Sequence, residues 1–223
     1  MPAIRRLAAL VVVAVVAATA SACAHPSPLL RPDKAERGTA PDTFAVRFET
    51  SKGPVLIEFY RAWAPRGVDR VYFLAQNGFY DETRFFRVIP RFVAQWGASG
   101  DTKVNAVWER RVIPDDPLKV SNGRGTVAFA HAGKNTRTTQ LFVNLANNAR
   151  LDSRGFTPIG RVVDGLNRVD ALYGGYGDGP PSGKGPDQDR MAAEGNDYLI
   201  KYYPRLDYVR EATIVRESRQ GGR

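Results

Sequence analysis

The stretch that decides the fold of this chain is residues 85–97, Phe85-Phe86-Arg87-Val88-Ile89-Pro90-Arg91-Phe92-Val93-Ala94-Gln95-Trp96-Gly97. It is rich in β-branched and aromatic residues and ends at a glycine, a pattern typical of short β-strands. Three further runs of the same kind follow at 125–131, 139–146 and 157–164. The central part of the chain is therefore predicted to be built from short strands.

Outward from this stretch, the pattern predicts a hairpin before it and a strand near the end of the chain. Residues 43–60 alternate apolar and polar side chains around a turn at 51–54, as two antiparallel strands do. Residues 65–78 show helical spacing between a proline and a glycine, which suit a helix start and end. A short helix is expected at 165–172 and a closing strand near 212–215. Many short strands with few helices favour a mainly β barrel or sandwich.

The composition describes a globular protein and excludes several kinds of site. The chain has 223 residues, of which 43% are apolar, enough to bury a core in one domain. With one cysteine and two histidines, it has no disulfide framework, and we expect no metal and no cofactor. The net charge of +9 is scattered rather than gathered in a dense basic run, so we expect a solvated basic surface and no nucleic-acid partner.

The N-terminal region is typical of an export signal. Arg5 and Arg6 precede an apolar stretch at 7–18, which is shorter than the roughly 20 residues of a membrane-spanning helix. A small-residue cleavage site, Ala20-Ser21-Ala22, comes directly before Cys23, as in the lipobox of bacterial lipoproteins. We therefore expect lipidation of Cys23 and an extracytoplasmic, membrane-anchored protein. Secretion as a soluble or periplasmic protein, and an uncleaved anchor, are the alternatives.

The predicted domain organisation has four parts. Residues 1–22 are a signal peptide, and residues 23–42 comprise the lipidated cysteine and a tether with four prolines. Residues 43–216 form the globular domain, and residues 217–223 are a polar tail. We expect the protein to be a monomer.

Four segments, in one order along the chain, resemble those of cyclophilin-type peptidyl-prolyl cis/trans isomerases, and specifically of bacterial, exported members of that family. They are residues 64–81, residues 85–97, residues 125–130 leading to 139–143, and residues 151–152 followed by 156–162. The resemblance extends over about residues 43–215. It implies an eight-stranded antiparallel barrel capped by two helices, in agreement with the mainly β pattern.

The chemistry of such a protein requires neither a nucleophile nor a general base. Rotation about an X-Pro bond has a barrier of about 18–20 kcal/mol, because the resonance of the amide must be broken. An apolar slot for the proline ring and a fixed donor that stabilises the twisted state would lower this barrier. Arg87 can supply that donor, because its guanidinium stays charged and its planar fork holds direction.

The resemblance assigns further roles residue by residue. Arg87 matches the catalytic arginine, and the substrate-binding positions are Phe92, Val93, Phe142 and Leu151 for the proline pocket, Gln95 and Gln140 beside the substrate backbone, the main chain at Ala130 and His131, and Phe156 at the place of a pocket histidine. Without the resemblance, the apolar residues could be plain core residues and Arg87 a solvated strand arginine. No acid–base role is expected for the imidazole of His131.

Three departures from the family pattern are visible. Val93 replaces a usual methionine, and Arg150 stands where many cyclophilins have a tryptophan that contacts cyclosporin. Residues 173–204 add a glycine-rich segment and a possible short helix, which we interpret as an elaborated loop. The glycines lack the Lys-Ser/Thr ending of a phosphate-binding loop, which disfavours nucleotide binding.

The leading hypothesis is a peptidyl-prolyl cis/trans isomerase that assists folding of exported proteins. Its partners would be proline-containing unfolded or extended polypeptides, and the membrane through the lipid anchor. A non-catalytic chaperone or scaffold module that holds such peptides is the alternative. A basic envelope protein that binds anionic polymers or lipids is a third, distinguished by a steep salt dependence.

Overall fold

The computed structural model describes residues 27–32 and 38–218. Within this part of the chain the strands are β1 (Thr43–Thr50), β2 (Gly53–Tyr60), β3 (Arg87–Ile89), β4 (Val93–Trp96), β5 (Thr126–Phe129), β6 (Leu141–Asn144), β7 (Pro158–Asp164) and β8 (Val209–Ser218). The helices are α1 (Pro65–Gln76), α2 (Thr102–Trp108), α3 (Leu166–Asp170), α4 (Gln188–Tyr202) and the 3₁₀ helix η2 (Ala149–Arg154). The predicted mainly β class is confirmed.

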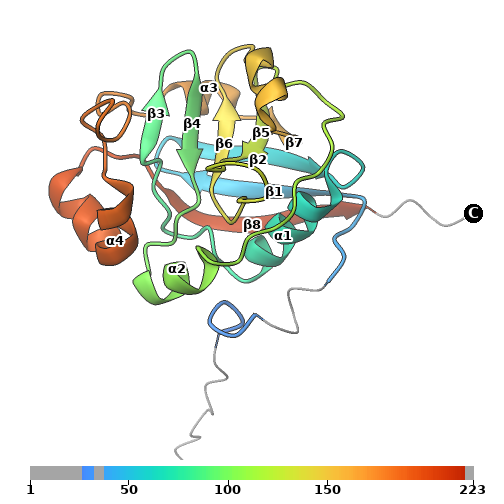
Figure 1. Cartoon of the computed structure of the whole chain (residues 1–223), viewed down its shortest axis with the longest axis horizontal. Coiled ribbons are helices and arrows are strands. Elements are labelled where there is room, and N and C mark those ends of the chain that lie inside the picture. The colour runs from blue at the N-terminus through green and yellow to red at the C-terminus, as the bar shows by residue number, and fades with distance from the viewer. Residues whose placement is uncertain (1–26, 33–37, 219–223) are drawn as a thin grey trace, which may run out of the picture.

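The eight strands form one antiparallel sheet in the order β3-β4-β6-β5-β7-β2-β1-β8. The sheet curls around a common core, as Figure 1 shows. Its two edges meet just before β3 and β8, where Arg84 bridges Tyr208 and the Phe85 N–H donates to the Asp207 carbonyl at 2.9 Å. The predicted eight antiparallel strands are thus confirmed, in a half-barrel whose edges meet over a few residues.

Two helices pack on the sheet and two pack beside it. Helix α1 lies against β2 and β8, and α3 lies against β2, whereas α2 and α4 contact each other (Figure 1). The sequence prediction of two capping helices therefore omitted α2. This helix has only seven residues, too few to show a clear helical period. Its N-cap is Asp101, whose carboxylate accepts from the Lys103 and Val104 N–H groups.

The predicted hairpin is formed by β1 and β2. The β1 residues Phe44, Val46 and Phe48 are buried in the core, as the two-residue period of a strand requires. The tight turn was expected at 51–54, and β2 begins within it at Gly53, whose φ of +104° is a conformation that side chains rarely adopt.

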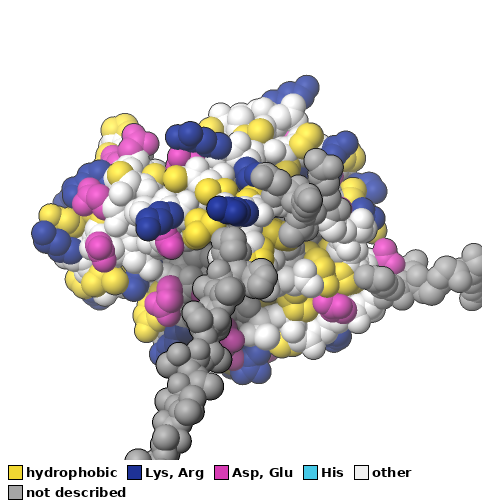
Figure 2. Space-filling model, turned by 90° about the horizontal axis from the view of Figure 1, so that it is seen from below, with side chains coloured by type: hydrophobic (Ala, Val, Ile, Leu, Met, Phe, Trp, Pro, Cys, Tyr) yellow, Lys and Arg dark blue, Asp and Glu magenta, His cyan; other side chains and the backbone are white. Residues whose placement is uncertain are grey.

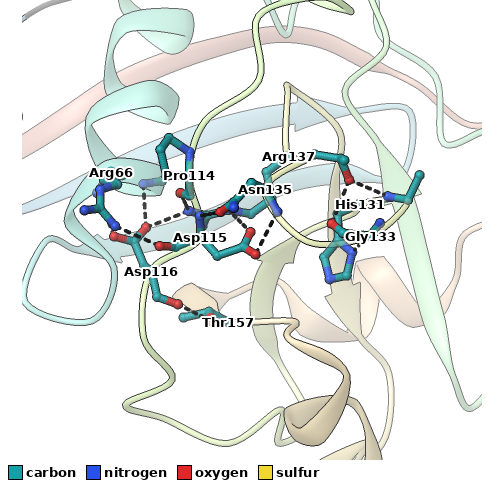
Figure 3. Close-up of polar contacts among 12 residues, drawn as sticks. Arg66, Pro114, Asp115, Asp116, His131, Gly133, Asn135, Arg137 and Thr157 are labelled. Atoms are coloured by element: carbon teal, nitrogen blue, oxygen red, sulfur yellow. Dashed lines mark hydrogen bonds and ion pairs between the residues drawn. The ribbon is translucent and has the colours of Figure 1, made fainter.

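Helix α1 begins at Pro65, as predicted, but its first turn has no side-chain cap of its own. The cap comes from a distant loop, because the Asp116 carboxylate accepts from the Arg66 N–H at 3.1 Å and the Gly67 N–H at 2.9 Å. Asp116 also pairs with the buried guanidinium of Arg137 at 3.0 Å (Figure 3). The Asp116 carboxylate therefore connects the start of α1 to its own loop and to the loop that carries Arg137.

Four described residues of the predicted tether, residues 23–42, are buried: Leu29, Pro32, Ala40 and Pro41. Leu29 and Ala40 are buried in the main core, and the Leu29 carbonyl accepts from the Trp108 indole at 2.9 Å. Trp96 and Trp108 are themselves fully buried. The signal peptide, Cys23 and residues 219–223 of the predicted tail lie outside the described residues. In residues 27–32 and 38–218, no helix combines the length and apolar character needed to cross a membrane.

The scattered charge expected from the sequence is visible on the surface. On the face shown in Figure 2, Lys and Arg side chains are spread among acidic ones instead of forming one basic patch. This arrangement agrees with a solvated basic surface.

Removing the Asp116 carboxylate should destabilise the fold strongly. Asp116→Ala leaves the buried Arg137 guanidinium with the Pro114 carbonyl and with the Asp115 carboxylate, 3.3 Å from its Nε, and it uncaps α1. Breaking a buried pair costs about 3–5 kcal/mol, and we expect about 3 kcal/mol, because Asp115 remains. Urea unfolding followed by tryptophan fluorescence measures the change in the free energy of unfolding.

The matched control is Asp170→Ala, which removes an exposed ion pair with Arg124. We expect a loss below about 1 kcal/mol for this surface pair. Equal losses in the two variants would show that the Asp116 network does not hold the fold together.

Candidate functional site

A candidate site lies on one face of β4, β5 and β6, three strands that are buried on both faces. In β4, Ala94 and Trp96 belong to the main core, whereas Val93 belongs to a second, separate apolar cluster. The same alternation sends Phe142 of β6 and Ala128 of β5 into this second cluster. Because successive side chains of a strand point to opposite faces, one set of strands builds both the core and the floor of a pocket.

The walls of this pocket come from loops and from η2. The pocket has a volume of about 180 Å³, and its lining residues are Arg87, Phe92, Val93, Phe142, Leu151, Arg154 and Phe156. The rings of Phe142 and Phe156 meet edge to face with centroids 5.7 Å apart. The structure therefore brings six of the residues chosen from the sequence around one mostly apolar cavity.

Arg87 is one of two arginines that line this pocket, the other being Arg154. It is the first residue of β3 and pairs with Gln95 in the β3–β4 register. Its Nε donates to Asp178 Oδ1 at 2.7 Å and its Nη2 to Asp178 Oδ2 at 3.0 Å. The guanidinium also lies 5.7 Å from the centre of the Phe92 ring. The hydrogen bonds from Arg87 lower the pKa of the Asp178 carboxyl, which favours its ionised form at neutral pH.

The two glutamines continue a polar row along one side of the pocket. Gln95 Oε1 accepts from Arg87 Nη1 at 3.4 Å, and Gln95 Nε2 donates to Gln140 Oε1 at 2.8 Å. Gln140 Nε2 in turn lies 3.4 Å from Gln188 Oε1, at the start of α4. Hydrogen-bond donors and acceptors thus lie beside an apolar slot, as a site for an extended peptide with a proline would require.

Ala130 and His131 lie at the far side of the pocket. The Ala130 N–H donates to the Gln140 carbonyl at 2.9 Å, so the β5–β6 pairing continues past β5, and the chain leaves the sheet at His131. The His131 ring stacks on Phe156 with centroids 4.0 Å apart, and burial lowers its pKa. Figure 3 shows that the Gly133 N–H donates to His131 Nδ1. The imidazole therefore serves mainly as a neutral packing group beside Phe156.

Three residues at the site were missed by the sequence prediction. Asp178 and Gln188 come from the 173–204 segment, and Arg154 lies at the end of η2. Asp178 contacts a residue 91 positions away, and no local pattern in the sequence signals such a contact. Arg150, noted as a departure from the family, lies with its guanidinium 4.8 Å from the centre of the Phe92 ring, at the rim of the pocket.

The described residues contain no group of three or more His, Cys, Asp or Glu side chains that could hold a metal ion. The polar groups at the pocket are the guanidinium groups of Arg87 and Arg154, the side-chain amides of Gln95 and Gln140, and the main chain. Such groups can bind and orient a peptide and stabilise charge, which is the chemistry of non-covalent catalysis.

Comparison with known proteins agrees with this geometry. The family model for cyclophilin-type peptidyl-prolyl cis-trans isomerases matches residues 45–191. The peptidyl-prolyl cis-trans isomerase ppi1 of Schizosaccharomyces pombe is 38% identical over 125 residues, which are 55% of this chain and 80% of that protein. Peptidyl-prolyl cis-trans isomerase-like 1 of Mus musculus is 35% identical over 141 residues, 59% of this chain and 82% of that protein.

The fold is also similar to a solved structure. A cyclophilin-type isomerase of Cryptosporidium parvum superposes with a TM-score of 0.59 at 20% identity, covering 78% of this chain and 99% of that one. These three proteins are eukaryotic, so they lend no support to the bacterial, exported part of the sequence hypothesis. The match to the family model and the eight-stranded half-barrel lead to one conclusion: the chain belongs to the cyclophilin-type peptidyl-prolyl cis-trans isomerase family.

Proposed function

We propose that the pocket between β4, β6 and η2 binds the proline of an extended polypeptide and that Arg87 accelerates rotation of the preceding peptide bond. The observation that carries the proposal is a fixed guanidinium on the wall of an otherwise mostly apolar pocket. Family membership supports it, since this family is defined by that reaction.

The proposed mechanism has two parts. The rings of Phe92 and Phe142, with Leu151 and Val93, grip the proline in all states of the reaction. An Arg87 N–H donates to the prolyl nitrogen or to the displaced carbonyl oxygen when the bond is twisted and amide resonance is lost. No bond to the protein forms or breaks, and no proton is transferred.

The substrate backbone would lie along the polar row. Gln95 and Gln140 lie beside the pocket, and the main chain at His131 follows directly on the β5–β6 pairing. An extended segment of an unfolded protein fits this arrangement, because its backbone groups are available for hydrogen bonds. The proposal is therefore an enzyme acting on proline-containing extended or unfolded polypeptides, as a monomer.

The cellular setting is proposed from the sequence. The basic residues at 5–6, the apolar stretch at 7–18 and the small residues before Cys23 support export and lipidation, which would place the domain outside the cytoplasm on a membrane. Its substrates would then be exported proteins during folding.

Arg87→Ala should lower the rate of isomerisation far more than peptide affinity. Removing one preorganised donor that acts on the transition state usually costs about 2.7–4 kcal/mol, or roughly 10²- to 10³-fold in rate. Arg87→Lys should recover little, since an ammonium lacks the planar fork. Exchange between the cis and trans forms of a proline peptide, followed by NMR, gives the rate, and a titration of the same samples gives the affinity.

Phe92→Ala is the comparison variant. Its ring borders the pocket and holds the proline in every state, so both affinity and rate should fall. An Arg87→Ala rate within about twofold of the parent protein would favour a non-catalytic module that only holds peptides.

Cys23 should carry lipid in the native host. The thiol follows directly after Ala20-Ser21-Ala22 and is the chain's single cysteine. Mass spectrometry of the mature protein, with Cys23→Ser as control, should find the N-terminus at Cys23 with a mass increase that the control lacks. A mature chain that begins at Cys23 with a free thiol would show that the protein is not a lipoprotein.

A further inference from the structure

The 173–204 segment covers the free edge of β3. Gly177 forms an antiparallel bridge with Val88, and Gly174 lies so close that a Cβ there would be 3.0 Å from Pro90 Cγ. The backbone at Gly177 has a φ of +68°, which favours glycine. The glycines of this segment therefore let it lie directly against β3, beside Arg87, as Figure 1 shows for the loop that precedes α4.

The loop holds Asp178 in one place. The Asp178 carbonyl accepts from the Gly185 N–H at 2.7 Å, and its carboxylate accepts from the Gly179 N–H at 2.9 Å. A Cβ at position 183 or 185 would be 2.2 or 2.8 Å from the Asp178 carbonyl oxygen, so this turn can only close around glycines. The carboxylate is thus oriented by its own loop before it meets Arg87.

Tyrosines of α4 and its C-terminal end fix the loop on the domain. The Tyr203 hydroxyl donates to the Gly185 carbonyl at 3.1 Å, and the Tyr198 hydroxyl accepts from the Asp187 N–H at 3.1 Å. Tyr198 packs in a buried cluster with Phe86, the neighbour of Arg87 in the chain. Two adjacent residues therefore contact the segment: Phe86 packs against Tyr198, and Arg87 binds the Asp178 carboxylate.

The ion pair orients Arg87 without using up its donors. A guanidinium has five N–H groups, and Asp178 takes one from Nε and one from Nη2. Gln95 receives a third at 3.4 Å, which leaves two for a substrate. Arg87 lines the proline pocket, whereas Asp178 does not. The Asp178 carboxylate binds the Nε and Nη2 edge of the Arg87 guanidinium and does not itself line the pocket.

We infer that Asp178 is a positioning residue of the isomerase site, which holds the Arg87 guanidinium at the pocket wall and leaves its remaining N–H groups for the substrate. The inference rests on the proposed function. Arginine has a long, flexible side chain, and a donor already in place needs no reorganisation when the peptide bond twists. The turn at 177–185, which carries Asp178, would then support catalysis rather than be only part of an elaborated loop.

The test is Asp178→Asn in the full chain, with Glu194→Gln as matched control. Glu194 is a carboxylate of the same segment that pairs with an arginine, Arg190, away from the pocket. We expect Asp178→Asn to lower kcat about tenfold with peptide affinity within about twofold, because orientation acts on the transition state. The control should match the parent, and Asp178→Glu, which keeps the charge, should recover part of the rate.

Two further readouts separate positioning from a general structural role. In an Arg87→Ala background, Asp178→Asn should change the rate by less than about twofold, since there is no guanidinium left to position. In the parent, NMR should show slow hydrogen exchange of the Arg87 Nε–H, and this protection should be lost in Asp178→Asn but not in Glu194→Gln.

If the parent is active and Asp178→Asn has the same rate, the inference about Asp178 is wrong and the proposed function stands. If Asp178→Asn is faster than the parent, the inference is also wrong, because Asp178 then competes with the substrate for Arg87. An equal loss with and without Arg87 would mean that Asp178 acts through folding only. A well-folded parent without isomerase activity would instead overturn the proposed function.

Discussion

The structure depends on three short strands that are buried on both faces. In β4, β5 and β6 every second side chain belongs to the main core, and one side chain of each strand on the opposite face, Val93, Ala128 or Phe142, belongs to the pocket cluster. A slip of one residue in register would exchange the two sets and place Trp96 in the pocket and Val93 in the core. The hydrophobic packing that stabilises the domain therefore also decides the shape of the site.

The polar part of the site is placed by the same register. Arg87 faces Gln95 across β3 and β4, and Gln95 faces Phe142 across β4 and β6. The guanidinium, the glutamine and the aromatic ring thus come from adjacent strands, whose spacing is set by backbone hydrogen bonds. Groups held in this way change position little during a reaction, which is what electrostatic stabilisation of a twisted peptide bond requires.

The 173–204 segment contacts Arg87 and the strand that carries it. It reaches the free edge of the sheet at β3, where a short strand offers unpaired backbone groups and little packing of its own. Glycines permit the close approach, and a tyrosine-rich cluster around Phe86 holds the segment in place. An edge strand that carries the charged group of the site is in this way covered, and its arginine is paired.

Much of the fold could be predicted from the sequence, because local patterns carry the information. The alternation in 43–60, the proline and glycine around α1, and the runs that form β3 to β7 each reflect the geometry of one element. The match of ordered motifs to a family then placed Arg87, Phe92, Phe142 and Leu151 at one pocket, where the structure has them. Helix α2 was missed because seven residues are too few for a periodic signal.

Other features were decided only by the tertiary structure. The cap of α1 by Asp116 and the pairing of Arg87 with Asp178 join residues 49 to 91 positions apart, and each partner taken alone is an ordinary loop aspartate. The sequence by itself determined most of the elements and the residue types that line the pocket, because periodicity and residue type are local properties. The pairing of charged side chains, such as Arg87 with Asp178, depends on how the loops pack around the sheet. That packing is decided by contacts and backbone hydrogen bonds over the whole domain.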